Sequence, residues 1–184
     1  MEKKTDRRVK YTLMVIRESF VKLLERKPIS KITVKEICEE ADINRATFYA
    51  HFNDPYDLLG HIETELTDGI IHYLSSYDFT GQPNASVEML EKILMFIREN
   101  AKIFHILLNT SGDMHFQQEV VQVIGQQHFS DLGSNRDDSE SIFLFFASGS
   151  IGLIQKWLKD GMQKPAGELA ELIIGLATNG ISKL

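Results

Sequence analysis

The hydrophobic and polar positions of this chain follow a helical pattern from end to end. From Arg8 to Arg26, apolar residues recur on one face as Val9, Leu13, Ile16, Phe20 and Leu23. Later segments predict further helices over about 54–74, 86–99, 101–109, 115–132, 139–160 and 165–177. No stretch has the pattern of a convincing strand. The sequence therefore predicts an all-α protein with about nine helices.

Residues 32–52, ITVKEICEEADINRATFYAHF, predict two short helices joined by a tight turn. Thr33 is suited to cap the first helix because its hydroxyl can accept a bond from a free backbone N–H. Glu36 follows three residues later and completes a capping box, while Ile32 and Ile37 occupy the positions of a hydrophobic staple. A connection of about four residues between the two helices predicts a helix-turn-helix.

The second helix of this motif should present most of its polar groups to the outside. Asn44 is its expected N-cap, and Phe48 and Phe52, four residues apart, share a face that should point into the core. Arg45 then carries a planar donor fork that can read a guanine edge. The predicted DNA-binding residues are Thr33, Lys35, Asn44, Arg45, Ala46, Thr47, Tyr49 and His51.

Thr47, Tyr49 and His51 carry the O–H and N–H donors that typically contact phosphate. A structural alternative stays open for two of them. In that interpretation Tyr49 only covers the edge of the core, and His51 only caps the end of the helix.

The first 60 residues resemble the DNA-binding domain of TetR/AcrR-family transcriptional regulators. The resemblance lies in the first helix, the Ile32-Thr33-Val34 start, Ile37, Ala41 and, most specifically, Thr47-Phe48-Tyr49-x-His51-Phe52. The chain has Asp42 where the family usually has a turn glycine, and Asp tolerates a left-handed backbone better than most residues. It has no Lys near Asp54-Pro55-Tyr56, where many members hold a phosphate, although Asp54 and Pro55 should start a helix well.

The helix over 139–160 is apolar or small on every side between Ile142 and Ile154. Such a helix must be covered all round, so we expect its own domain on one side and a second copy of the chain on the other. Two helices from each subunit would then form a four-helix interface. The predicted dimer residues are Ser148, Gly149, Gly152, Trp157, Leu169, Leu172, Ile173 and Leu176. The alternative is a central buried helix in a monomer.

The segment from Gly152 to Met162, followed by Pro165 and Glu168-Leu-Ala-Glu-Leu, resembles the C-terminal domain of a mostly Firmicutes branch of the same family. Some members of that branch act with protein or small-molecule coactivators. Earlier helices are rich in aromatic residues, which is typical either of an ordinary core or of a ligand cavity. The residues expected at such a cavity are Phe96, Phe104, His105, His115 and Phe116.

The formal net charge of −6 is divided unevenly along the chain. Residues 1–51 hold 12 Lys and Arg against 8 Asp and Glu, whereas the remainder holds 8 against 18. The basic residues Lys3, Lys4, Arg7, Arg8 and Lys10 form an N-terminal arm near the motif. Because charge acts over only about 10 Å at moderate salt, the local excess favours DNA binding despite the acidic total. The alternative for this arm is a disordered, solubilising tail.

Other classes of protein find little support in the sequence. None of the six histidines lies in an HExxH or CxxC-type metal pattern, and no P-loop, GxGxxG or GxSxG is present. We therefore expect no enzyme activity, no metal and no cofactor. The single Cys38 excludes an internal disulfide and suits a small buried hydrophobe in a reducing cytoplasm. The N-terminus has no signal-peptide pattern, and the apolar stretch 142–154 is too short to span a bilayer, so no membrane is expected.

Together these patterns predict two domains. Residues 1–53 form a three-helix DNA-binding domain, and residues 54–184 form a helical ligand-binding and dimerisation domain. The resemblance implies a dimeric repressor that binds a palindromic operator in double-stranded DNA and responds to an effector. The alternative is an activator, or a coactivator-dependent regulator, whose C-terminal domain docks a protein instead of a small ligand.

Overall fold

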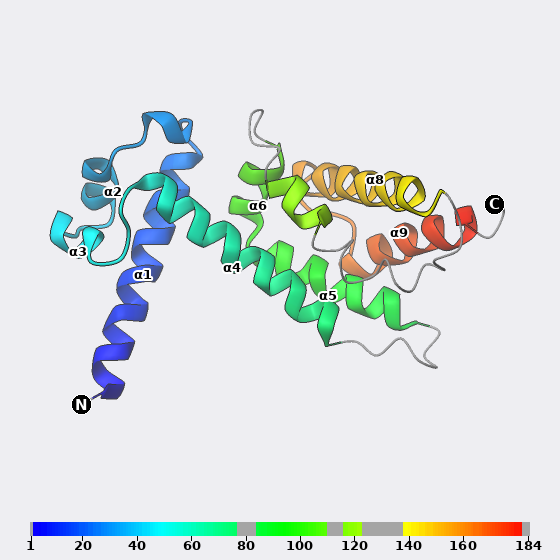
Figure 1. Ribbon diagram of the computed structural model, residues 1–184, viewed down its shortest axis with the longest axis horizontal. Helices are drawn as coiled ribbons and strands as arrows, with labels where there is room; N and C mark the ends of the chain where they lie inside the picture. The colour runs from blue at the N-terminus through cyan, green and yellow to red at the C-terminus, as the bar shows by residue number, and fades with distance from the viewer. Residues whose placement is uncertain (1, 77–83, 110–115, 123–137, 182–184) are drawn as a thin grey trace. The chain divides into compact units, whose positions relative to one another are not determined.

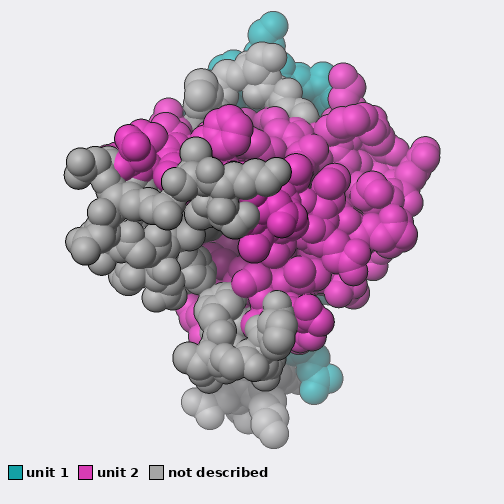
Figure 2. Space-filling view, turned by 90° about the vertical axis from the view of Figure 1, so that its right-hand side faces the viewer, with its two compact units in different colours: residues 1–66 teal, residues 67–184 magenta. Residues whose placement is uncertain are grey.

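The computed structural model describes residues 2–76, 84–109, 116–122 and 138–181 (Figure 1). In these residues the regular secondary structure is helical throughout, which confirms the all-α prediction. The chain divides into two compact units, residues 1–66 and 67–184, and the division falls within a helix (Figure 2). The predicted domain boundary at 53/54 lies just before that helix begins.

Unit 1 contains the helix-turn-helix. Its elements are α1 (Glu2–Leu24), the short 3₁₀ turn η1 (Ile29–Lys31), α2 (Val34–Glu40), α3 (Arg45–Tyr49) and the first half of α4 (Pro55–Ser75). The core of the unit is formed by large apolar side chains that are fully buried, among them Ile16, Phe20, Ile37 and Phe48. The stripe predicted for the first helix is thus buried from Ile16 onward, whereas Val9 near its start is exposed.

Ion pairs join the helices of unit 1 around this core. Lys22 of α1 and Arg26, just after that helix, each lie 3.6 Å from one carboxylate oxygen of Glu40 at the end of α2. Earlier in α1, Arg17 donates to Glu65 of α4 at 3.2 Å. These pairs are largely exposed and each is worth little. The buried apolar contacts, which α2 and α3 share with α1, therefore hold the unit together.

Unit 2 is built from the second half of α4, α5 (Ala85–Glu99), α6 (Ala101–Asn109), a helical segment at residues 116–122, α8 (Ser139–Lys159) and α9 (Ala166–Ile181). Helices α5 and α9 lie against one another along much of their length. The helix predicted over 115–132 is observed at 116–122, and the loops predicted at 77–83 and 110–113 lie outside the described residues.

The turn between α8 and α9 positions the only tryptophan of the chain. Gly161 and Met162 both have a left-handed backbone, with φ of 73° and 56°. The turn brings the carbonyl of Lys164 within 2.7 Å of Trp157 Nε1, which donates a hydrogen bond to it. With its polar atom satisfied in this way, Trp157 is buried.

Helix α8 has two apolar faces with different surroundings. One face, which includes Phe143, Phe146 and Ile154, is turned toward the interior of unit 2. The opposite face exposes Leu144 and Phe145, whose exposed fractions are 55% and 73%. The helix is thus apolar all round, as predicted, but its own unit covers only one side of it.

A candidate nucleic-acid interface

The start of α2 is fixed by hydrogen bonds between neighbouring residues. Thr33 Oγ1 accepts from the backbone N–H of Glu36 at 3.3 Å, and Thr33 N donates to Glu36 Oε2 at 3.0 Å, so the predicted capping box is confirmed. Lys27 Nζ lies 2.5 Å from the other carboxylate oxygen. The hydrogen bonds from Lys27 and Thr33 lower the pKa of Glu36 from 4.5 to about 2. The carboxylate therefore stays ionised and holds the cap over a wide pH range.

The turn that follows α2 has the geometry that a glycine usually supplies. Asp42 has φ of 51°, and the Ile43 N–H donates to the Cys38 carbonyl at 3.0 Å while the Asp42 N–H donates to Glu39 at 3.4 Å. These two bonds form the Schellman pattern of a helix C-terminus. The prediction that Asp42 adopts a left-handed conformation is confirmed. Cys38 is buried beside this turn, and burial raises its pKa, so its thiol stays protonated.

Helix α3 is capped as expected but ends earlier than the sequence pattern indicates. Asn44 Oδ1 accepts from Thr47 N at 2.8 Å and from Thr47 Oγ1 at 3.1 Å. The helix covers Arg45–Tyr49 with Ala50 as its C-cap, and residues 50–51 form a turn. The expected helical run to Phe52 was therefore too long. Phe48 and Phe52 are nevertheless both buried, as predicted.

The predicted DNA-binding residues fall into two groups. The polar atoms of Thr33, Asn44 and Thr47 make the caps just described, so these residues shape the motif. Residues of the second group have outward-facing side chains that no cap uses. These are Lys35, Arg45, Ala46 and Tyr49, with Tyr49 exposed to 57%.

His51, the eighth predicted residue, belongs to neither group. It is half-buried at the edge of a groove of about 450 Å³ between α1 and α4, whose floor includes Phe52 and Leu58. Its backbone N–H donates to Phe48 O at 2.9 Å. Its ring therefore lies where the end of the motif meets α4.

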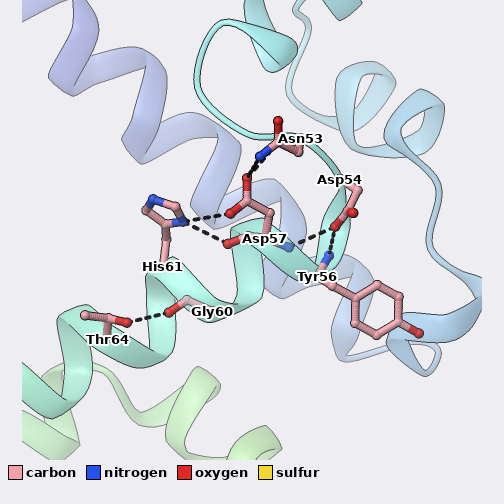
Figure 3. Close-up of polar contacts among 7 residues, drawn as sticks. All are labelled: Asn53, Asp54, Tyr56, Asp57, Gly60, His61 and Thr64. Carbon is pink, nitrogen blue, oxygen red and sulfur yellow. Dashed lines mark hydrogen bonds and ion pairs between the residues drawn. The ribbon is translucent and has the colours of Figure 1, made fainter.

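The N-terminus of α4 is closed by its own side chains (Figure 3). Asp54 Oδ1 accepts from the N–H groups of Tyr56 and Asp57 at 2.8 and 2.9 Å, which confirms Asp54 as the N-cap. Asn53 donates to Asp57 through its backbone N–H and its side-chain amide, at 2.7 and 2.9 Å. His61 Nδ1 lies 2.9 Å from the Asp57 carbonyl oxygen. Because these amides already have carboxylate acceptors, they are not free to bind a phosphate.

The N-terminal basic arm belongs to a helix, because α1 begins at Glu2. The alternative of a disordered tail is therefore wrong for this segment. Arg7, Arg8 and Lys10 are exposed on α1, whereas the side chains of Lys3 and Lys4 lie outside the described residues.

In unit 2 three of the predicted ligand residues, Phe96, Phe104 and Phe116, lie in an aromatic cluster. Ring centroids are 5.9 Å apart for Tyr73 and Phe96, and 6.0 Å apart both for Phe96 and Phe104 and for Phe104 and Phe116. Phe104 and Phe116 are fully buried and His105 is exposed. His115 lies outside the described residues.

The ring of Phe96 fills the space over Gly69 of α4, where any side chain would collide with it. These rings pack against one another, which favours the alternative of ordinary core.

A hollow is present elsewhere in unit 2. It has a volume of about 290 Å³ and is lined by residues of α4, α5, the segment 116–122, α8 and α9. None of the four predicted cavity residues that the structure describes, Phe96, Phe104, His105 and Phe116, lies among its lining residues. The sequence pattern could not reveal it, because its walls are apolar side chains of the same kinds that fill the core.

The predicted dimer residues divide by exposure. Ser148, Gly149 and Gly152 of α8 and Leu172 and Leu176 of α9 are exposed in the protomer. The other three, Trp157, Leu169 and Ile173, are buried within unit 2. Their side chains are already covered within the protomer, so the exposed residues are the ones available to a second copy.

The sequence of this chain matches two models of known protein families. A model of the tetR family of bacterial regulatory proteins matches residues 16–62, and a model of a transcriptional regulator C-terminal region matches residues 84–179. The chain belongs to the TetR family of transcriptional regulators. The resemblance noted from the sequence is thereby confirmed, and TetR-family regulators bind DNA and typically dimerise.

Individual relatives of this TetR-family chain are distant. A Bacillus subtilis protein described as the uncharacterized HTH-type transcriptional regulator YxbF is 26% identical over 110 residues, which is 58% of this chain and 29% of that protein. The chain thus spans less than a third of that relative's length.

Solved structures show the same fold. A TetR regulator from Streptococcus agalactiae is 20% identical, with a TM-score of 0.66 over 96% of this chain and 99% of that one. The dihydroxyacetone kinase operon activator DhaS is 19% identical, with a TM-score of 0.60 over 94% and 97%. The regulator FadR from Bacillus subtilis, solved with stearoyl-CoA, is 14% identical, with a TM-score of 0.61 over 89% and 96%.

The family and the structure also bear on the expectations about location, enzyme activity, metal binding and a membrane span. TetR-family regulators are soluble cytoplasmic proteins and are generally not enzymes. Within the described residues no group of three or more His, Cys, Asp or Glu is placed to hold a metal. The argument from length against a membrane span was incomplete, because Glu140–Lys159 of α8 is long and apolar enough by composition. A helix that packs in a soluble protein passes the same test.

Proposed function

We propose that this protein is a homodimeric repressor that binds a palindromic operator through α2 and α3 and releases it in response to an effector. The observation that carries the proposal is the exposed group on the helix-turn-helix. Lys35, Arg45 and Tyr49 are exposed on a motif in which Thr33 and Asn44 already cap the N-termini of the two helices. Exposed side chains that neither helix cap uses, at this position of a TetR-family motif, are suited to contact DNA.

We assign different tasks to these residues. Arg45, at the start of α3, would read a base edge in the major groove, because its donor fork matches the two acceptors of guanine. Tyr49 and Lys35 would contact phosphates and so position the motif without reading sequence. His51, half-buried beside Phe52, would complete the contact at the end of the motif.

The outward face of α8 supports the proposed dimer. Leu144 and Phe145 are largely exposed, and Gly149 and Gly152 have no heavy atom outside their own helix within 4 Å of an added Cβ. Small residues beside large apolar ones allow a second helix to approach closely. With Leu172 and Leu176 of α9, this face would pair with the same face of a second copy about a two-fold axis. Two motifs would then meet successive major grooves, which requires a palindromic site.

The hollow in unit 2 favours a small effector over the protein-docking alternative, because a docking domain needs no internal space. One fold relative, FadR, was solved with stearoyl-CoA, which supports a small ligand in this class of domain. A second candidate is an activator, since another fold relative, DhaS, is described as an operon activator. Activation and repression would use the same DNA contacts and differ in where the operator lies.

A selection of random-sequence DNA with the purified protein tests the proposal directly. We expect the enriched sequences to be inverted repeats whose half-sites lie about one helical turn apart, or a multiple of it. Enrichment of single, unpaired half-sites would contradict the proposed dimer, and no enrichment at all would contradict the DNA-binding function.

A further inference from the structure

The hollow in unit 2 has an unusual chemical lining. Of the seventeen lining residues that the structure describes, sixteen carry apolar side chains and none is charged. The exception is Ser150, whose hydroxyl donates to the Phe146 carbonyl at 2.7 Å and so already has its partner. A molecule inside would meet hydrocarbon walls on all described sides.

Such walls select strongly against charge. An ion that enters loses its hydration, and these side chains offer no opposite charge and no free donor in return, because the one hydroxyl already donates to a carbonyl and can only accept. An apolar molecule, in contrast, gains by leaving water. Dry cavities lined by Leu, Ile and Phe behave in this way and accept small apolar ligands.

The size of the hollow limits the ligand further. Its volume of about 290 Å³ lies near the lower end of the range for ligand pockets, roughly 300–1,000 Å³. It is also about twice the engineered cavity of roughly 150 Å³ that holds benzene. This space fits a molecule of about two rings and is far larger than the small voids of an ordinary core.

We propose that the effector of this regulator is an uncharged, apolar molecule of about two rings, bound in this hollow. The inference rests on the proposed effector control of DNA binding and names the chemical class of the effector. Helix α8 would connect the hollow to the proposed dimer face. It lines the hollow with Phe146 and Ile154 and carries Leu144 and Phe145 on its other face. A ligand against one face can thus change the position of the other.

Two fluorescent probes that differ by one ionised group test the charge selection. Naphthalene is uncharged, and naphthalene-1-sulfonate has the same two fused rings with a sulfonate added. We expect the neutral probe to bind the full-length protein with a Kd below about 100 µM and at least roughly tenfold more tightly than the sulfonate. Equal affinity for the two probes, or no binding of the neutral one, would overturn the inference.

Two variants locate the bound probe on α8. Ala147 lines the hollow, so Ala147→Phe should fill it and weaken binding of the neutral probe by about tenfold or more. Lys102 is exposed on α6 and is not among the residues that line the hollow, so the matched variant Lys102→Phe should leave probe binding unchanged. Loss of binding in Lys102→Phe, or undiminished binding in a folded Ala147→Phe, would place the probe outside the hollow and overturn the inference.

Folding of each variant is checked by far-UV circular dichroism. If Ala147→Phe does not fold, Ala177→Phe on α9 fills the same hollow from the opposite wall and replaces it. Should neither fold, the comparison of the two probes on the wild-type protein still decides the matter.

Operator binding separates this inference from the proposed function. The neutral probe should change affinity for a selected operator by at least about fivefold, and the sulfonate should not at the same concentration. A protein that binds its operator but ignores the neutral probe would retain the proposed DNA binding and lose the inferred effector class. A protein that binds the neutral probe selectively but no DNA would lose the proposed function instead.

Discussion

The helix-turn-helix of unit 1 and the α8–α9 pair of unit 2 are stabilised in different ways. Helices α2 and α3 have seven and five residues, and a side chain caps each of them. Helix α8 has 21 residues and no side-chain cap hydrogen bond at Asp138, and one of its apolar faces is exposed. The helices of the first pair are capped within their own unit, whereas α8 leaves Leu144 and Phe145 exposed in the protomer.

This difference explains how each region can serve its function. Because Thr33 and Asn44 cap the helices of the motif, the exposed Arg45 and Tyr49 remain available to DNA. In unit 2, the proposed dimer and effector site would both use apolar surface, on the outward face of α8 and in the hollow behind it. DNA binding by the motif should therefore be sensitive to the loss of single polar contacts. Contacts made by α8 should be sensitive to changes in side-chain volume.

The largest effect is expected from adding bulk to the outward face of α8. Gly152→Trp should fold normally, because an added Cβ meets no neighbour within 4 Å, but it should block the close approach of a second copy. Loss of the dimer removes the avidity of two linked half-sites, so operator affinity should fall about 100-fold or more. Analytical ultracentrifugation and a gel shift measure the two consequences.

A matched control for that variant is Lys102→Trp, which adds the same side chain at an exposed site on α6. It should leave both the dimer and operator affinity unchanged. A wild-type protein that is monomeric at micromolar concentration would show instead that the exposed face of α8 has another partner.

The next effect concerns the exposed tyrosine of the motif. Tyr49→Ala should weaken binding to every DNA sequence by about 1–3 kcal/mol, because a phosphate contact carries no sequence information. Tyr49→Phe keeps the ring, which packs edge-on against Phe48 at 5.7 Å, and removes only the hydroxyl. The two variants should weaken binding similarly if the hydroxyl makes the contact.

Arg45→Ala should change DNA binding in a sequence-dependent way, unlike Tyr49→Ala. It should relax the preference at one base pair per half-site by about 1–3 kcal/mol and change binding to other sequences much less. Salt-matched gel shifts on a panel of operator variants distinguish the two patterns. Unchanged affinity of Tyr49→Ala would show that Tyr49 only covers the core edge.

A smaller effect is expected from the turn between α2 and α3. Asp42 has φ of 51°, a conformation that glycine adopts without steric cost. Asp42→Gly should therefore stabilise the protein by roughly 0.5–1 kcal/mol, and Asp42→Val should destabilise it by at least as much. Thermal unfolding of the three proteins gives the order, and a less stable glycine variant would show that the Asp side chain itself contributes to the turn.

The smallest effect concerns the capping box in acid. The folded-state pKa of Glu36 is lowered to about 2 from an ordinary value of 4.5, so its carboxylate adds stability above pH 4.5 that disappears as the pH falls toward 2. The wild-type protein should melt at a higher temperature than Glu36→Gln at neutral pH. This difference should shrink between pH 4.5 and 2, and a pH-independent difference would mean that the charge has no role in the cap.

Much of unit 1 could be predicted from the sequence, because its determinants lie close together in the chain. The capping residues Thr33, Asn44 and Asp54 act on amides two or three residues away, and Phe48 and Phe52 share a face by helical spacing. The sequence pattern placed the end of α3 too far along the chain, at Phe52 instead of Tyr49. Apolar residues at helical spacing continue to Phe52, and this periodicity does not show that residues 50–51 form a turn.

In unit 2, the sequence by itself determined that α8 is apolar on every side, but not what lies against each side. Only the tertiary structure decided that Trp157, Leu169 and Ile173 are buried while Leu172 and Leu176 are exposed. It also decided that the predicted aromatic residues pack together and that the hollow lies elsewhere. Helical spacing assigns a residue to a face, whereas burial and empty volume depend on helices far apart in the chain, whose packing no local pattern encodes.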